Sequence, residues 1–233
     1  MEKSFWITQS EPSASLLADR LIRSGRPVIK SPVIEIKPIV FTAPAETADL
    51  VVCLSSHAAR FYLKSNLYQS NRKTPHIAIG RMTASILQAE QINTMVPDLE
   101  NSEGILKLRV FEELIPDQVV WVLAGRGGLG AIERALDGTC RLIKVDLYER
   151  VEKEIKGVDA SGVGCIVISS EMALDLADKF WRSNLGDFSI PMLVASNRIR
   201  EKALSLGFTK TQTIGSANTS DIFDYLEEFI DRE

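Results

Sequence analysis

The stretch that decides the fold is residues 119–138, VVWVLAGRGGLGAIERALDG, because it repeats the plan of residues 4–25, SFWITQSEPSASLLADRLIRSG. In both stretches an apolar run leads into small polar residues and then into an amphipathic segment of helical length. The alignment places Trp121 on Trp6. A strand followed directly by a helix is the repeating element of α/β proteins.

The repeat extends over the rest of the chain in the same order. The further matching blocks are 49–59 on 164–174, 75–91 on 191–207, and 100–114 on 217–230. These blocks predict two similar α/β units of about 115 residues each. In the first half we expect strands at FWIT, PVIKSPVIEI, DLVVCLSS, HIAIG and TMVP, and helices over 13–24, from 58, over 83–89 and over 103–114. Continuous apolar strands indicate parallel sheets with helices on both faces, so the predicted fold class is α/β.

Composition narrows the class of protein. The 233 residues are 45% hydrophobic and 25% charged, values typical of a folded globular chain. The net charge of −4, with neither sign clustered, argues against general nucleic-acid binding. The start, MEKSFWITQSEP, does not resemble a secretory signal, and no apolar run is long enough for a membrane span, so we expect a cytoplasmic protein without membrane contact.

Cysteine and histidine are scarce. We expect the three cysteines, Cys53, Cys140 and Cys165, to be reduced, and Cys53 and Cys165 lie in apolar strand-like runs. The two histidines, His57 and His76, cannot build a histidine-rich metal centre, and no pair has zinc spacing. Metal catalysis is therefore not expected.

Small polar residues follow each expected strand. They are Thr8-Gln9-Ser10, Ser55-Ser56, Gly80, Gly125-Arg126-Gly127, Ser169-Ser170 and Ser196-Asn197. Helix amino termini at the carboxyl edge of a parallel sheet favour anions, so these residues can form a shared site for carboxylates or phosphates. Helix capping alone explains such residues equally well.

The sequence GRGGLG at 125–130, with Asp146 after it, fits the dinucleotide-binding fingerprint. Its counterpart in the first half, TQSEPS, has no glycine, which disfavours a nucleotide site. Three interpretations stay open: an NAD(P) site, a loop whose amides and Arg126 bind another anion, and a structural turn. Tyr148, expected at a strand end in KVDLYERVEKEI, is either a packing residue or a functional phenol.

Taken together, these blocks resemble the uroporphyrinogen-III synthase family over nearly the whole chain. The resemblance rests on DLVVCLSSHAA, AIGRMTASIL, LAGRGG, VDLYERV, CIVISSEMAL and TSDIFDYLEEFI in that order. It implies two flavodoxin-like domains joined by a two-strand linker, with one domain inserted in the other. Residues 1–34 and 152–233 would form one domain and 38–147 the inserted one, with linkers near 34–37 and 148–151. Two thin crossings imply a hinge and a substrate cleft.

The resemblance also implies a reaction without metal or cofactor. Hydroxymethylbilane loses its hydroxyl group to give an azafulvene, and the last ring attacks through a spiro intermediate and ends inverted in uroporphyrinogen III. Tyr148 matches the family's tyrosine, whose phenol can give a proton to the leaving oxygen. The alternative is that Tyr148 only holds the linker. The implied partner is this linear tetrapyrrole with eight carboxylates, handed over from hydroxymethylbilane synthase to a monomeric enzyme.

Binding residues carry over one by one. The implied substrate-binding residues are Thr8, Ser55, Ser56, Gly80, Arg81, Thr83, Gly125, Arg126, Gly127, Ser169, Ser170 and Ser196. The family's early Thr-Arg-Pro pattern lacks its Arg in Thr8–Pro12, and the second Gly-x-x-Thr-Ala pattern is lost at Ser196–Arg200. Two rival functions stay open: an NAD(P)-dependent reductase that uses GRGGLG, and a non-catalytic two-domain module that binds anions.

Overall fold

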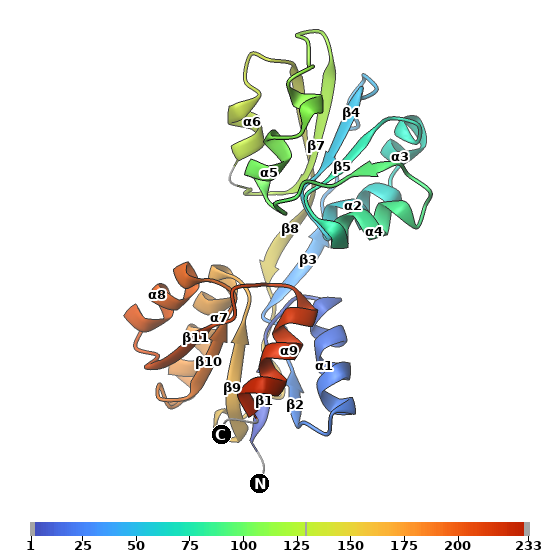
Figure 1. The fold of residues 1–233 in the computed structure, drawn as a ribbon. Helices are drawn as coiled ribbons and strands as arrows, with labels where there is room; N and C mark the ends of the chain where they lie inside the picture. The colour runs from blue at the N-terminus through green and yellow to red at the C-terminus, as the bar shows by residue number, and fades with distance from the viewer. Residues whose placement is uncertain (1–2, 129, 231–233) are drawn as a thin grey trace. The chain divides into compact units, whose positions relative to one another are not determined.

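The structure is a computed structural model that describes residues 3–128 and 130–230. The chain divides into two compact units. Unit 1 combines Met1–Glu35 with Val151–Glu233, and unit 2 is Ile36–Arg150. Each unit is a sheet with helices packed against it (Figure 1), so the predicted α/β class is confirmed.

Unit 1 contains a wholly parallel sheet among its described residues. In spatial order its strands are β11 (Lys210–Thr213), β10 (Pro191–Val194), β9 (Val163–Ile168), β1 (Ser4–Ile7) and β2 (Val28–Lys30). Its helices are α1 (Ser13–Arg23), α7 (Glu171–Ser183), α8 (Asn197–Ser205) and α9 (Thr219–Ile230), with a 3-10 turn at Ala160–Gly162. Because β1 pairs with β9, the two ends of the chain share one sheet.

The core of unit 1 is built on Trp6. Its indole is fully buried, lies 5.4 Å from the Phe180 ring and 6.2 Å from the Trp181 ring, and donates a hydrogen bond to Ser31 O at 3.0 Å. On the other side of the sheet, α1 places Leu17 among buried side chains that include Leu226 of α9. The apolar residues of SASLLADRLIR therefore recur with the helical period and form one buried face of α1.

Apart from Ile34–Glu35 and Val151–Glu152, which belong to unit 1, the second sheet belongs to unit 2. In spatial order its strands are β3 (Ile34–Pro38), β8 (Arg141–Glu152), β7 (Val119–Gly125), β4 (Leu50–Cys53), β5 (His76–Ala78) and β6 (Thr94–Met95). Its helices are α2 (Ser56–Leu63), α3 (Asn66–Asn71), α4 (Arg81–Gln88), α5 (Ser102–Leu106) and α6 (Ala131–Ala135), with a 3-10 turn at Arg109–Phe111. Strands β4 to β8 run parallel, whereas hydrogen bonds from Ile39 N to Leu147 O and from Lys153 N to Val33 O make β3 antiparallel to β8.

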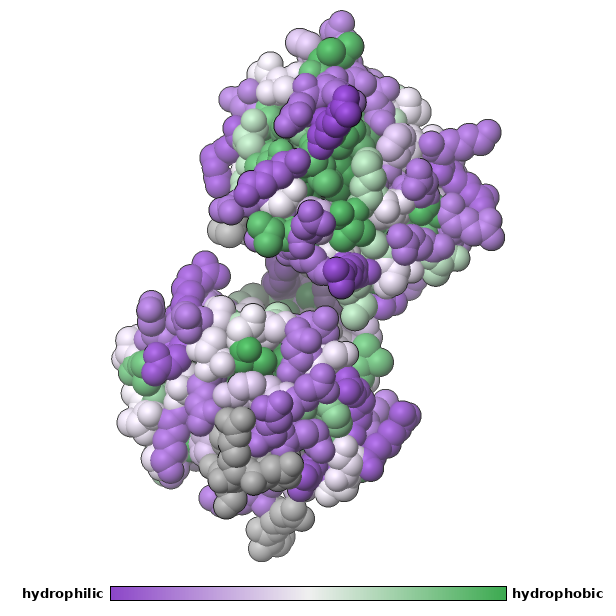
Figure 2. All heavy atoms as spheres, viewed as in Figure 1, coloured by the Kyte–Doolittle hydropathy of each residue, from purple (hydrophilic) through white to green (hydrophobic). Residues whose placement is uncertain are grey.

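The helix expected over 103–114 is wrong in its length. Helix α5 ends at Leu106, and Leu108 is extended before the short turn at Arg109–Phe111. This break lets Ile105 and Phe111 both reach the core, where they are 0% and 7% exposed. Several apolar side chains around them are only partly buried, and Figure 2 shows hydrophobic spheres gathered on the surface of unit 2.

The three cysteines are thiols and form no disulfide bond among the described residues. Cys53 and Cys165 are buried and Cys140 is half-buried. Burial raises the pKa of the Cys53 thiol, which keeps it protonated and unreactive.

Candidate functional site

Unit 2 gathers many of the predicted site residues at one edge of its sheet. Strands β8, β7, β4 and β5 are neighbours and parallel, so the segments that leave the carboxyl ends of β7, β4 and β5 emerge side by side. These segments carry Gly125, Ser55 and Gly80, and Tyr148 pairs with Gly125 in β8. A register irregularity between Ala124 and Gly125 accompanies this pairing.

Tyr148 lies inside β8, which continues to Glu152, and not at a strand end as expected. Its side chain is 1% exposed. The phenolic oxygen lies 3.0 Å from Ser55 Oγ, where either hydroxyl can donate, and accepts a hydrogen bond from Arg150 Nη2 at 3.1 Å. Ser55 Oγ also accepts from Ala58 N at 3.0 Å and so caps α2.

Two residues of α2 pack on the phenol ring. The His57 and Tyr148 ring centroids are 5.5 Å apart, and the Phe61 ring lies 6.0 Å away at an interplanar angle of 25°. They stand four positions apart and therefore share one helix face. Burial, and then the positive charges of Arg150 and Arg60, lower the pKa of His57, so its ring is neutral near pH 7.

Gly125 makes room for the phenol. A Cβ built on Gly125 would lie 2.5 Å from Tyr148 Cζ and 2.9 Å from its hydroxyl oxygen. In addition, Arg126 N donates to Tyr148 O at 2.8 Å. The glycine at the end of β7 is thus required by the ring that lies against it.

The loop after β7 gives no support to the dinucleotide interpretation. Gly127 and Gly130 have φ angles of 80° and 63°, as tight turns demand, and Leu129 lies outside the described residues. The following helix, α6, has only 5 residues, too few to present a strong amino-terminal dipole. Arg126, expected to face an anion, forms an ion pair with Glu149 at 3.0 Å.

The amino end of α4 already holds a carboxylate. Glu100 Oε2 accepts from Arg81 N at 3.1 Å, and Glu100 Oε1 lies 3.6 Å from Arg81 Nε. A Cβ on Gly80 would lie only 2.2 Å from Glu100 Oε2. Thr83 is 3% exposed in the first turn of this helix. The backbone here therefore binds a carboxylate of the protein itself, and the binding of a substrate anion at this place stays a prediction.

The predicted residues of unit 1 follow β1, β9 and β10 at the carboxyl edge of its own sheet. Thr8 is fully buried and its hydroxyl donates to Val167 O at 2.6 Å. Ser170 Oγ accepts from Ala173 N at 3.2 Å and Ser196 Oγ from Ile199 N at 3.4 Å, so both serines cap helices. Ser169 is half-buried beside them. Their role in substrate binding stays a prediction.

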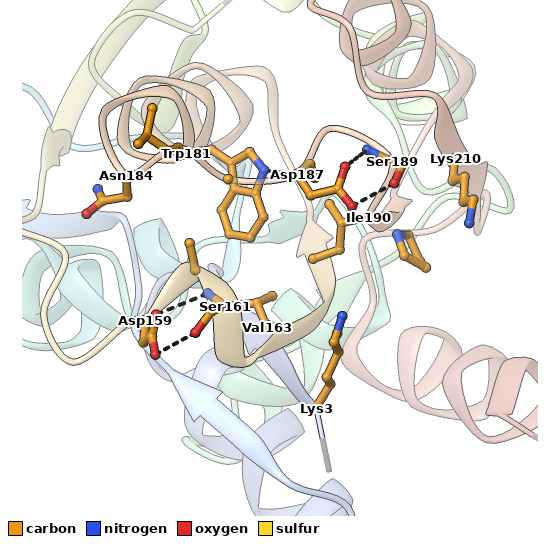
Figure 3. Close-up of a pocket in the computed structure, with 15 residues that line it drawn as sticks. Lys3, Asp159, Ser161, Val163, Trp181, Asn184, Asp187, Ser189, Ile190 and Lys210 are labelled. Carbon is orange, nitrogen blue, oxygen red and sulfur yellow. Dashed lines mark hydrogen bonds between the residues drawn. The ribbon is translucent and has the colours of Figure 1, made fainter. Parts of the chain in front are cut away.

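Unit 1 also contains a cavity of about 410 Å³ at the opposite, amino edge of its sheet (Figure 3). It is bordered by the Trp181 indole and by Lys3 and Lys210. Asp159 and Asp187 each bind the serine two positions on through backbone N–H and hydroxyl. Hydrogen bonds from Ser189 hold the pKa of the Asp187 carboxyl below its usual value. None of the predicted site residues lines this cavity.

Sequence reasoning missed Arg150, His57, Phe61 and Glu100. Residues i and i+2 of a strand share a face, so the spacing between Tyr148 and Arg150 could have indicated that the two side chains lie together. The pair His57 and Phe61 could have been found from its spacing after Ser55. No local pattern indicated Glu100, since its loop meets α4 only through the fold.

In the part of the chain that the structure describes, no group of three or more His, Cys, Asp or Glu side chains is placed to hold a metal ion. No helix within 3–128 or 130–230 is long and apolar enough to cross a membrane.

Comparison with known proteins gives a family and a fold. Residues 15–215 match the family model described as uroporphyrinogen-III synthase HemD. No curated protein matches the chain. Among solved structures, uroporphyrinogen-III synthetase from Helicobacter pylori 26695 matches with a TM-score of 0.67 at 10% identity, over 98% of this chain and 100% of that chain. A mutant uroporphyrinogen III synthase from Thermus thermophilus matches with a TM-score of 0.57 at 14% identity, over 99% and 100%. At these identities the structural similarity concerns the fold.

Proposed function

The chain belongs to the uroporphyrinogen-III synthase family, and we propose that it closes hydroxymethylbilane to uroporphyrinogen III with Tyr148 as the proton donor. Two observations together carry the proposal. Residues 15–215 match the family model, and the Tyr148 phenol is hydrogen-bonded to Ser55 and Arg150 beside the predicted binding residues. The enzyme is then a lyase that eliminates water.

The chemistry asks for a proton at one oxygen. The hydroxyl of the hydroxymethyl group leaves as water once its oxygen gains a proton, while the methylene carbon stays on the pyrrole and the pyrrole nitrogen's electron pair drives the break of the C–O bond. Phenols in water have a pKa near 10, so a phenol can give that proton near neutral pH and recover it later. The azafulvene is then attacked by the last ring, and passage through a spiro intermediate inverts that ring. Holding the chain in the conformation that leads to inversion is the enzyme's main task.

The eight carboxylates of the substrate need donors. The amide of Arg81 at the start of α4 is a suitable donor, because in this structure it binds the carboxylate of Glu100. We assign Gly80, Thr83, Ser55 and Ser56 to substrate binding on unit 2. On unit 1 we assign Thr8, Ser169, Ser170 and Ser196. We further propose a monomeric, cytoplasmic enzyme that receives its substrate from hydroxymethylbilane synthase.

The test supplies freshly made hydroxymethylbilane and separates the oxidised product isomers. An excess of the type III isomer over the spontaneous type I isomer supports the synthase activity. Only type I product at high enzyme concentration would refute it. Tyr148→Phe should lower turnover by about 10-fold or more, the usual scale of acid–base catalysis. Tyr225→Phe is the matched control, because the phenol of this half-buried residue donates a hydrogen bond only to Gln212 among the described residues.

A further inference from the structure

Arg150 lies over the Tyr148 phenol. The two residues stand two positions apart in β8, so their side chains share one face of the strand. Arg150 Cζ is 5.3 Å from the centre of the Tyr148 ring, and Nη2 is 3.1 Å from the phenolic oxygen. The guanidinium therefore contacts both the ring and the oxygen that would give up a proton.

The hydrogen-bond inventory at this oxygen is restrictive. A guanidinium can only donate, so the phenolic oxygen accepts from Arg150. Ser55 Oγ already accepts a hydrogen bond from Ala58 N. It lies 3.0 Å from the phenolic oxygen of Tyr148 and can donate its own proton to that oxygen. When Ser55 donates, the phenolic oxygen accepts twice and its own proton has no partner within the group.

The charge of Arg150 is not neutralised by a neighbour. Within residues 3–128 and 130–230, no carboxylate forms an ion pair with Arg150, and Glu149 next to it is paired with Arg126. His57, the other titratable group on the phenol, is neutral near pH 7 because burial and two arginines lower its pKa. The positive charge at the phenol is thus that of Arg150.

From this geometry we propose that Arg150 is a positioning residue for the ring-closure reaction. Its guanidinium and the Ser55 hydroxyl hold the Tyr148 oxygen as a double acceptor, which keeps the phenolic proton for the substrate's leaving hydroxyl. The same two donors then stabilise the phenolate that remains. This inference rests on the proposed function and deepens it.

The step balances. The Tyr148 O–H bond breaks and the proton goes to the hydroxymethyl oxygen, while the C–O bond breaks and water leaves. The pyrrole nitrogen supplies the electron pair, and the resulting azafulvenium loses its N–H proton to the phenolate. A phenolate in a buried position is costly without donors, and a charged donor is the stronger kind. Arg150 and Ser55 supply such donors already in place.

The test compares Arg150→Gln and Arg150→Lys in steady-state kinetics with fresh hydroxymethylbilane. We expect Arg150→Gln to lower kcat by about 10-fold or more with KM changed less than about 3-fold, as loss of a stabilising donor predicts. Arg150→Lys should recover part of the loss, because an ammonium keeps the charge. In a Tyr148→Phe background, Arg150→Gln should change kcat by less than about 2-fold. Arg60→Gln is the control, because Arg60 also acts on His57 but is not one of the two groups that bind the phenolic oxygen.

A second measurement does not depend on activity. The sequence has only two histidines, so a proton NMR titration resolves His57 directly. Arg150→Gln should raise the pKa of His57, since one of the positive charges that lower it is removed. An unchanged His57 titration would mean that the guanidinium does not lie at this site, and would overturn the inference.

The kinetic outcomes separate the inference from the proposed function. Wild-type protein that forms only the type I isomer refutes both. Wild-type protein that forms type III, with full turnover in Arg150→Gln, refutes this inference alone. A rise in KM without a fall in kcat also refutes it, because Arg150 would then be a substrate ligand. Equal losses of kcat from Arg150→Gln in the Tyr148 and Tyr148→Phe backgrounds would also refute this inference.

Discussion

Gly125 and Tyr148 are in such close contact that any side chain on the glycine would meet the phenol ring, with a Cβ 2.5 Å from Tyr148 Cζ. The contact links the end of β7 to the side chain of its neighbour β8. It also fixes the height of the ring above the sheet and so the place of its hydroxyl.

We therefore expect Gly125→Ala to displace the phenol. Overpacking in a buried contact costs about 1–3 kcal/mol of unfolding free energy, and turnover should fall by as much as in Tyr148→Phe. Gly128→Ala in the same loop is the control, because its Cβ would meet only Gly125 O at 3.7 Å. Urea unfolding and the isomer assay measure the two effects. Equal behaviour of the two variants would contradict the proposed contact.

Glu100→Gln should slightly lower the free energy of unfolding and improve substrate binding. Loss of a negative charge at the amino end of α4 costs about 0.3–1 kcal/mol. At the same time the Arg81 amide loses a charged competitor for substrate carboxylates, so KM should fall. Glu90→Gln, at an exposed position just after the same helix, should change neither quantity. A higher KM in Glu100→Gln would show that Glu100 assists binding.

Acid should destabilise the protein below about pH 6.5 through its histidines. His76 is fully buried, donates from Nδ1 to Thr74 O at 2.7 Å and accepts the Tyr62 hydroxyl at Nε2 at 3.0 Å. Burial lowers the pKa of His76 and of His57. Near pH 6.5 the unfolded chain therefore binds protons that the native state does not bind. The free energy of unfolding falls as pH drops through this range.

Urea midpoints at pH 7.5 and pH 5.5 check this expectation. His57→Gln should reduce the difference between the two midpoints, because one of the two groups no longer titrates. A midpoint that is equal at both pH values would be inconsistent with histidines whose pKa is lowered in the native state.

Gly186→Ala should destabilise unit 1 without touching unit 2. Its Cβ would lie 2.2 Å from Trp181 Cε2, against an indole that is fully buried and donates to Asp187 O at 3.1 Å. We expect a loss of about 1–3 kcal/mol. Gly162→Ala is the control, because its Cβ would meet nothing within 4 Å. Thermal unfolding followed by tryptophan fluorescence measures the difference.

The sequence was sufficient for the fold class because the signal was periodic. Apolar β-branched strands and amphipathic helices recur, and the alignment of Trp6 with Trp121 places both indoles in buried strands. The length of the helix after Asn101 could not be read from local pattern, because burial of Phe111 decides where it breaks.

Only part of the candidate site could be predicted from the sequence. Tyr148 and the strand-end residues were found from resemblance and position in the chain. The contact of Glu100 with α4 joins a loop to a helix that precedes it, so no spacing could reveal it. Likewise, the second hydrogen bond at the phenol depends on the strand order β8-β7-β4, which brings Ser55 to the oxygen that Arg150 contacts from the same strand.

The pairing of β1 with β9 has a consequence for synthesis on the ribosome. Strand β1 pairs with β2, which follows it closely in the chain, but its second partner, β9, is made only after the whole of Ile36–Arg150 has emerged. Unit 2 is continuous and can complete its sheet while β1 and α1 still lack most of their core. The intervening chain must then close a long loop, whose entropic cost grows only slowly with length but which delays folding. Unit 1 is thus the last part to become native, and its early strand is the segment most in need of protection from wrong partners until Val163–Ile168 appears.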